Sequence, residues 1–347
     1  MNSTLKEEFQ YLLFFWVQCK SDVLLFKYYA FQSDYLKKQS NIQYYFSFNF
    51  QRVIDNTESL QNSKLLSEQQ HDEFLKIEIV HQQLEDKDAQ KIGQSLLNFC
   101  DIQYLKIDLH HNKIGPQGAC EIASGLSRCF NLEVLVINLC YNAICADGLK
   151  ALIKGIQNCK NLRQLTLNLN GNNIRDEGII QFYERLGTFD NLSKLSLHLS
   201  QNKITDVGAQ YLAKAFCKFQ SISELKIHLF SNRIGQEGLD CMVKSLKNTN
   251  IKDLRIDIRQ NEIDETGMIN LVKDIKNCKY LRNLHIEINR NNFEENTLFK
   301  LAQGLKNCTQ IMTLKINILS QNYDEEIIDS LIKTLKKMQR LVRLCIA

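Results

Sequence analysis

The sequence predicts an α/β fold: a curved solenoid (horseshoe) of about nine 30-residue strand–turn–helix repeats, with parallel strands on the concave side and helices on the convex side. Two observations predict it. One pattern recurs along most of the chain, and within each copy the spacing of apolar residues changes from two to four. A step of two is typical of a strand with one buried face, and a step of four of a helix. Because no unit this small buries both faces alone, the units are expected to stack.

Each unit opens with a strand. Its first apolar position is leucine in every copy from Leu75 to Leu344, at steps of 30 residues except for one step of 29 between Leu225 and Leu254. Two more apolar columns follow at intervals of two residues, the first running from Ile77 to Ile346 and the second from Ile79 to Ile318. These three columns predict the buried side of one parallel sheet.

A turn follows each strand. Seven units carry asparagine there, from Asn112 to Asn291, and glutamine replaces it at Gln82 and Gln321. An amide both donates and accepts hydrogen bonds. Because an unpaired buried backbone group costs about 1–3 kcal/mol, we expect these amides to pair with the backbone of the turn.

A short helix completes each unit. Six units carry glycine before it, and pairs such as Leu212 and Phe216 then recur at a spacing of four. Acidic residues precede the helix and lysines lie near its end, which complements the helix dipole. Helices pack about 10 Å apart and strands about 4.8 Å apart, so the stack is expected to curve with the strands inside.

The full pattern, L-x-x-L-x-L-x-L-x-x-N-x-I-x-x-x-G-x-x-x-L-x-x-x-L, resembles the leucine-rich repeat, in particular the ribonuclease-inhibitor-like subclass, over residues 74–347. The strand is two residues longer than in the usual repeat, so the curvature is not transferred. The resemblance implies a scaffold for protein–protein interaction. The family also includes Ran-type GTPase-activating proteins and repeat arrays attached to signalling domains.

The chain is expected to have three parts: residues 1–41 as a helical N-terminal cap, 42–73 as a degenerate capping repeat and link, and 74–347 as the solenoid. In the second part, Tyr44, Phe46 and Phe48 would take the three apolar columns. The aromatic N-terminus could instead dock a partner or lie on a membrane surface. The last strand, at Leu344, is either an edge strand or the end of an incomplete gene model, and an unprotected edge would favour self-association.

The outward positions of the strands form polar columns. The middle column reads Glu78, Asp108, Asn138, Asn168, His198, His228, Asp257, Glu287 and Asn317. It is either a hydrogen-bonded ladder on a solvated sheet or a stripe that contacts a ligand. Lys106, Lys226, Arg255 and His285 flank it on one side, and His110, Phe230, Arg259 and Arg290 on the other. The candidate partner-binding residues are Asp108, His110, His198, His228, Phe230, Asp257, Arg259, Glu287 and Arg290. Reversing the charges of Asp257 and Arg259 together is expected to weaken binding without unfolding.

Several classes of function are disfavoured. His198, His228 and Asp257 could form a metal site, but a structural role fits their alternation with Asn better, and no metal or other cofactor is predicted. The 12 cysteines include no C-x-x-C pair, and several share one column with Phe and Met, which indicates buried apolar residues. The chain carries none of the common phosphate-binding, kinase, hydrolase or metalloprotease motifs, so it is not expected to be an enzyme.

Composition also bears on partners and location. The net charge of +4 is spread along the chain and does not indicate nucleic-acid binding. The apolar run at 11–17 is too short to span a membrane and lacks the basic start of a secretory signal, so a cytoplasmic location is expected.

The favoured function is a non-catalytic scaffold that binds a protein partner through the concave strand face and the adjoining loops. One alternative is a GTPase-activating protein that would use a loop arginine such as Arg175 or Arg233. Another is a fragment of a larger receptor or kinase-linked protein.

Overall fold

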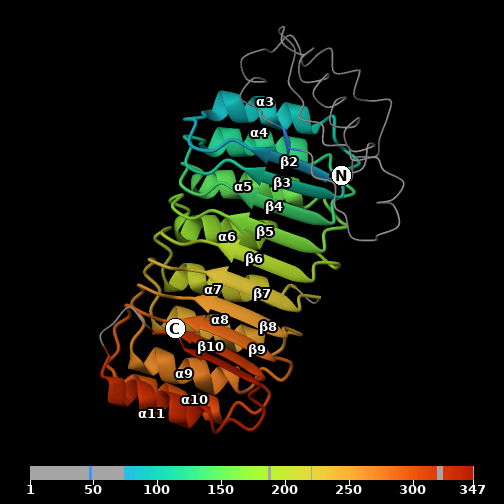
Figure 1. Ribbon diagram of the computed structural model, residues 1–347. Coiled ribbons are helices and arrows are strands. Elements are labelled where there is room, and N and C mark those ends of the chain that lie inside the picture. Colours follow the sequence, from blue (N-terminus) through green and yellow to red (C-terminus); the bar gives the residue numbers. More distant parts are fainter. Residues whose placement is uncertain (1–46, 49–73, 187–188, 220, 319–322, 347) are drawn as a thin grey trace, which may run out of the picture.

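The computed structural model describes residues 47–48, 74–186, 189–219, 221–318 and 323–346. In these ranges eleven parallel strands form one open sheet, in which spatial order follows sequence order (Figure 1). The strands are β1 (Ser47–Phe48), β2 (Phe74–Glu78), β3 (Tyr104–Asp108), β4 (Val134–Asn138), β5 (Gln164–Asn168), β6 (Lys194–His198), β7 (Glu224–His228), β8 (Asp253–Asp257), β9 (Asn283–Glu287), β10 (Thr313–Asn317) and β11 (Arg343–Ile346).

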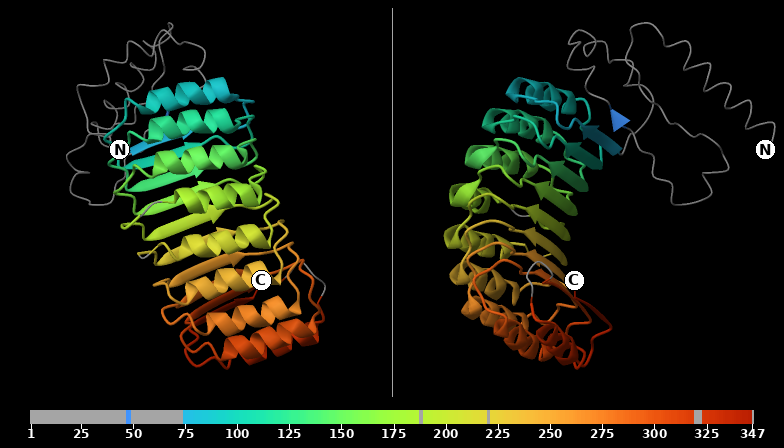
Figure 2. Two further views of the ribbon diagram at one scale, coloured as in Figure 1. Left: turned by 180° about the vertical axis from the view of Figure 1, so that it is seen from behind. Right: turned by 60° about the vertical axis from the view of Figure 1, so that its left-hand side comes forward.

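One helix follows each strand from β2 to β10, and these helices cover one side of the sheet. They are α3 (Asp86–Leu96), α4 (Pro116–Leu126), α5 (Cys145–Ile156), α6 (Arg175–Arg185), α7 (Asp206–Phe216), α8 (Gln236–Leu246), α9 (Glu265–Ile275), α10 (Asn296–Lys306) and α11 (Glu325–Leu335). Figure 2 shows that the stack curves with the strands on its inner side and the helices on its outer side. The predicted α/β solenoid is confirmed.

The strand register follows the repeat. Leucines of the first column lie opposite each other, as in Leu165 opposite Leu195 and Leu225 opposite Leu254, so the one-residue deletion is absorbed in the link before β8. Hydrogen bonding continues past the assigned strands, because the Ile79 N–H donates to Asp108 O and the His81 N–H to His110 O. The third apolar column lies in this extension and is buried, which agrees with the long strand predicted from the sequence.

The turn asparagines form the expected ladder. Asn202, which is fully buried, accepts hydrogen bonds from the N–H groups of Asn172 and Ile174 in the preceding repeat, both at 3.0 Å. Its Nδ2 donates to Leu169 O at 2.8 Å and to Ser200 O at 3.1 Å. One side chain therefore satisfies four backbone groups and joins two repeats.

The acidic residues at the helix starts do more than complement their own helix dipole. Asp206, the first residue of α7, accepts hydrogen bonds from the N–H groups of Gly235 and Gly238 at the start of α8, at 2.7 and 2.9 Å. Asp176 makes the same contacts to Thr205 and Gly208. These carboxylates cap the helix of the next repeat and so fix how neighbouring repeats stack.

At the N-terminal end, Phe48 of β1 lies opposite Ile77 of β2. The sequence pattern had placed Phe46 there, so the observed register differs from the expected one by two residues. The two predicted N-terminal helices and the rest of residues 1–73 lie outside the described residues. So does Gln321 of the amide column.

Candidate protein-binding face

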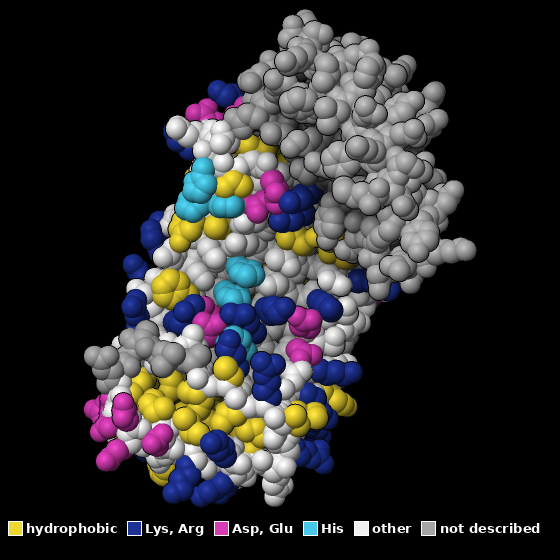
Figure 3. Space-filling view, viewed as in Figure 1, with side chains coloured by type: hydrophobic (Ala, Val, Ile, Leu, Met, Phe, Trp, Pro, Cys, Tyr) yellow, Lys and Arg dark blue, Asp and Glu magenta, His cyan; other side chains and the backbone are white. Residues whose placement is uncertain are grey.

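The concave face consists of the outward side chains of the strands, arranged in straight columns by the parallel register. In the middle column Asp108 lies opposite Asn138, His198 opposite His228, and Asp257 opposite Glu287, as the sequence predicts. In Figure 3 histidine side chains form separate patches on this face, and acidic and basic side chains lie next to each other. The candidate residues therefore divide into clusters, and they do not form one continuous stripe.

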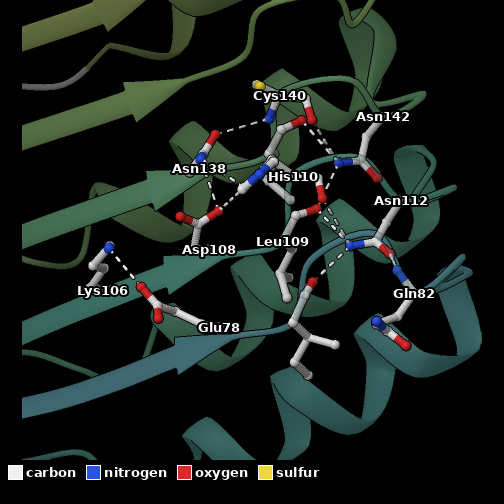
Figure 4. Close-up of polar contacts among 12 residues, drawn as sticks. Glu78, Gln82, Lys106, Asp108, Leu109, His110, Asn112, Asn138, Cys140 and Asn142 are labelled. Carbon is white, nitrogen blue, oxygen red and sulfur yellow. Dashed lines mark hydrogen bonds and ion pairs between the residues drawn. The ribbon is translucent and has the colours of Figure 1, made fainter. Parts of the chain in front are cut away.

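The first cluster lies over β2 to β4 (Figure 4). Asp108 Oδ1 is 2.5 Å from His110 Nδ1 and accepts a hydrogen bond from Asn138 Nδ2 at 2.8 Å. Next to this group, Lys106 Nζ pairs with Glu78 at 2.8 Å. Lateral pairing between adjacent strands thus uses most of the polar capacity of these side chains, and it holds them in fixed positions.

The second cluster begins with two stacked imidazoles. The rings of His198 and His228 are 4.3 Å apart and nearly parallel, and His198 Nε2 is 3.0 Å from Ser196 Oγ. Burial is the main cause that lowers the pKa of His198 to about 4, and the nearby His228, Arg255 and Lys226 act in the same direction while Asp257 opposes them. His198 is therefore neutral at neutral pH, and the stacked pair presents a flat aromatic surface.

An ion-pair network continues this cluster over β8 and β9. Arg259 binds Asp257 through two parallel contacts, Nε to Oδ1 at 2.8 Å and Nη2 to Oδ2 at 2.6 Å. Arg259 also lies 3.2 Å from Glu287, which accepts a hydrogen bond from Arg255 at 2.7 Å. The Arg259 guanidinium lies 5.3 Å from the centre of the Phe230 ring.

The environment of Asp257 keeps it ionised. Burial works to raise its pKa, but hydrogen bonds from Arg259 and His228 outweigh this effect and hold the pKa at about 2. Arg259 is the counterpart, because its bonds to Asp257 raise the pKa of the guanidinium.

The structure places three candidate residues of this cluster differently from the expectation. Asp257 and Glu287 are only 2% and 4% exposed, so they offer little surface to a partner, and they hold Arg255 and Arg259 in place from beneath. The double reversal of Asp257 and Arg259 exchanges the charges of a pair whose acidic member is almost fully buried, so it changes stability as well and does not test binding alone. Arg290 is not in the column of Phe230 and Arg259: Asn289 lies there, and Arg290 is the exposed next residue, with a φ of 58°.

Three residues that the sequence placed beside the middle column were not among the candidate contacts. Lys226, Arg255 and His285 lie in register on β7, β8 and β9, as their place in the column predicts. They were omitted because each base alone looks like an ordinary surface charge.

A second missed group lies on the loops beyond β2 to β4. His81 stacks on His111 at 4.3 Å, and His111 stacks on Tyr141 at 4.5 Å. All three residues have φ between 53° and 56°, and only the recurrence of this turn brings them together. Tyr141 lies against Gly171, where a Cβ would approach the ring to 2.6 Å, and its hydroxyl donates to Gln201.

The loop arginines considered for GTPase activation lie at the outer ends of two turns. Arg175 is exposed, and its Nε donates to Asn173 Oδ1. Arg233 is exposed too, and its backbone N–H is bonded to Ile204 O. Both side chains face solvent from the repeat edge.

In the described ranges no group of three His, Cys, Asp or Glu side chains is placed to hold a metal ion. None of the helices seen in these ranges is long and apolar enough to cross a bilayer.

Comparisons with known proteins found one family model and several solved structures that are similar to this chain. A family model described as "Leucine Rich repeat" matches residues 159–182 and 195–213. No curated protein matches the sequence. One similar solved structure is titled "Leiomodin-1 Actin-Binding Site 2 (ABS2)", with 15% identity and a TM-score of 0.31 over 55% of this chain and 87% of the other. Another is a Caenorhabditis elegans tropomodulin C-terminal domain, with 16% identity and a TM-score of 0.35 over 47% of this chain and 92% of the other. The two matched segments are thus similar in sequence to leucine-rich repeats, while the ribonuclease-inhibitor-like subclass stays a prediction.

Proposed function

We propose that this chain is a non-catalytic scaffold that binds a protein partner through its concave strand face and the adjoining loops. One observation carries the proposal: the outward columns of adjacent strands form an extended polar surface whose side chains are already held by their neighbours. The His198–His228 stack and the Arg259–Asp257 pair are examples. A surface fixed in this way loses little side-chain entropy when a partner binds.

The candidate contacts have different roles in this proposal. Phe230 and Arg259 are half-exposed and offer an aromatic and a guanidinium contact, the residue types that most often dominate interfaces. His198 and His228 add a flat aromatic surface next to them. Asp257 and Glu287 act indirectly, by fixing the arginines. At the other end of the face, His110 and Asp108 form a separate contact region.

The proposal is tested by affinity capture from lysate of the source cell, read by quantitative mass spectrometry. Thr166 points outward from the middle of β5, on the concave face, and Thr166→Trp would block the face without adding charge. The matched control is Ser124→Trp on the exposed side of α4.

We expect proteins that are enriched by the wild type to be lost with Thr166→Trp and kept with Ser124→Trp. Circular dichroism and thermal unfolding establish beforehand that both variants fold. If Thr166→Trp retains every protein that the wild type captures, the concave face is not the binding surface.

A further inference from the structure

The outward column next to the middle one carries no acidic residue on any strand from β2 to β10. It reads Lys76, Lys106, Val136, Thr166, Ser196, Lys226, Arg255, His285 and Lys315. Basic side chains thus lie at both ends of this column, and small uncharged side chains lie at its centre. We call the four consecutive bases on β7 to β10, Lys226, Arg255, His285 and Lys315, the basic row.

The basic row keeps exposed cationic side chains. The Arg255 side chain is 39% exposed although it pairs with Glu287. Lys315 is half-exposed, and no carboxylate in the described part of the chain forms an ion pair with it. Lys226 pairs with Glu224 at 2.6 Å, but its side chain is 45% exposed.

The nearby carboxylates offset part of the charge of the arginines, but they lie below the surface that a partner touches. Asp257 and Glu287 are almost fully buried, and each binds an arginine. Burial lowers the pKa of His285, and Arg255 and Lys315 act in the same direction while Glu287 opposes them, so the charge of the row comes from Lys226, Arg255 and Lys315.

We propose that this column is the track on which an acidic, extended segment of the protein partner docks, with its carboxylates opposite the basic row. This inference rests on the proposed function and names the chemistry of the partner. Three strand spacings separate Lys226 from Lys315, or about 14 Å, which an extended chain covers with about four to five residues. The segment would run across the strands, along the axis of the solenoid, and would carry uncharged residues opposite Val136, Thr166 and Ser196.

An acidic peptide fits this track better than other anions do. A flat lipid surface cannot reach the floor of a concave face (Figure 2). A nucleic acid of moderate affinity makes about six to ten phosphate contacts, and the row offers fewer cations, with Glu224 and Asp253 on the same strands next to it. In contrast, a carboxylate can accept two parallel hydrogen bonds from the guanidinium of a single arginine.

The test is fluorescence anisotropy with a fluorescein-labelled octaglutamate peptide, titrated with the full chain. Octaglutamine is the neutral comparison. We expect octaglutamate to bind about tenfold more tightly than octaglutamine at low ionic strength, and the difference to shrink as salt is added.

The variant Lys226→Gln/Lys315→Gln removes two charges from the basic row. Its matched control is Lys113→Gln/Lys203→Gln, which removes two charges from exposed loop positions. We expect the row variant to weaken octaglutamate binding about fivefold or more, and the control to change it less than about twofold.

Three results would overturn the inference: equal binding of the two peptides, equal loss in both variants, or a DNA oligonucleotide or phosphatidylserine vesicle that binds the basic row more tightly than octaglutamate does. In each case, loss of captured partners with Thr166→Trp would still support the concave face as the binding surface. Failure of the acidic segment and failure of the proposed function are therefore separate outcomes.

Discussion

At the scale of single residues, the buried amides of the turns contribute most clearly to stability. Asn202 bonds to four backbone groups at once. An alanine at this position removes the bonds of two N–H groups and of Leu169 O, whereas Ser200 O still accepts from the N–H of Gly171.

We therefore expect Asn202→Ala to lower the free energy of unfolding by about 3 kcal/mol or more, since each orphaned group costs about 1–3 kcal/mol. Urea denaturation followed by circular dichroism measures the change. Asn161→Ala, at an exposed asparagine in the link before β5, is the control and should cost less than about 1 kcal/mol. A similar cost for both variants would contradict the role assigned to the ladder.

His198 gives the protein a pH dependence of known sign. Its pKa falls from 6.5 to about 4 on folding, so between these values the unfolded chain binds a proton that the folded chain does not. The stabilising contribution of neutral His198 is complete above pH 6.5 and is lost as the pH falls towards 4, by at most about 3 kcal/mol.

The matched variant is His198→Asn, because asparagine occupies the same column at Asn168. We expect urea unfolding at pH 7, 5.5 and 4 to show a smaller loss of stability for His198→Asn than for the wild type. An unchanged pH profile would mean that His198 is not held neutral by its surroundings.

The cysteines separate into reactive and unreactive thiols. Burial raises the pKa of Cys129, Cys159 and Cys308 to about 12 and that of Cys278 to about 11, whereas Cys120 and Cys217 are exposed. We expect a disulfide reagent such as DTNB to label Cys120 and Cys217 in the folded protein, and the four buried thiols only after denaturation. Mass spectrometry of the peptides shows which cysteines are labelled. Rapid labelling of Cys129 in the native protein would contradict its burial.

At the scale of elements, helices α3, α4 and α5 pack closely against each other at glycine positions. A Cβ on Gly125 would lie 2.3 Å from Gly93 O, and one on Gly155 would lie 2.3 Å from Ala123 O, so α3, α4 and α5 approach each other by their backbones. In a free helix, alanine in place of glycine would stabilise by about 1 kcal/mol.

We expect the opposite sign for Gly155→Ala, which should destabilise by about 1–3 kcal/mol because the two helices must move apart. Thermal unfolding measures this loss of stability. The control is Lys154→Ala at the exposed neighbouring position. Stabilisation by Gly155→Ala would show that the helices can separate freely.

The elements themselves were predictable from sequence because the apolar period repeats many times, and errors in one unit are corrected by its neighbours. The leucine column from Leu75 to Leu344 sets both the strands and their register. The contacts between helix starts were not predictable: Asp206 was interpreted as serving its own helix, and only the stacking of repeats brings it to Gly235.

At the scale of the whole molecule, the sequence predicted which side chains point to the concave face, but it did not predict their depth. Asp257 and Glu287 have the composition of surface residues, yet curvature and the long side chains of Arg255 and Arg259 cover them. The histidine–tyrosine stack at His81, His111 and Tyr141 escaped the pattern for a different reason, since it depends on left-handed turns that leave no periodic apolar signal.

Photo-crosslinking tests the central claim most directly. A benzophenone amino acid replaces Ser196 on the concave face in one variant and Ser124 on α4 in another, and adducts formed in living source cells are identified by mass spectrometry. We predict that a defined protein is crosslinked at position 196 and not at 124. Crosslinks to the same proteins from position 124, or from the two positions equally, would contradict a concave binding face.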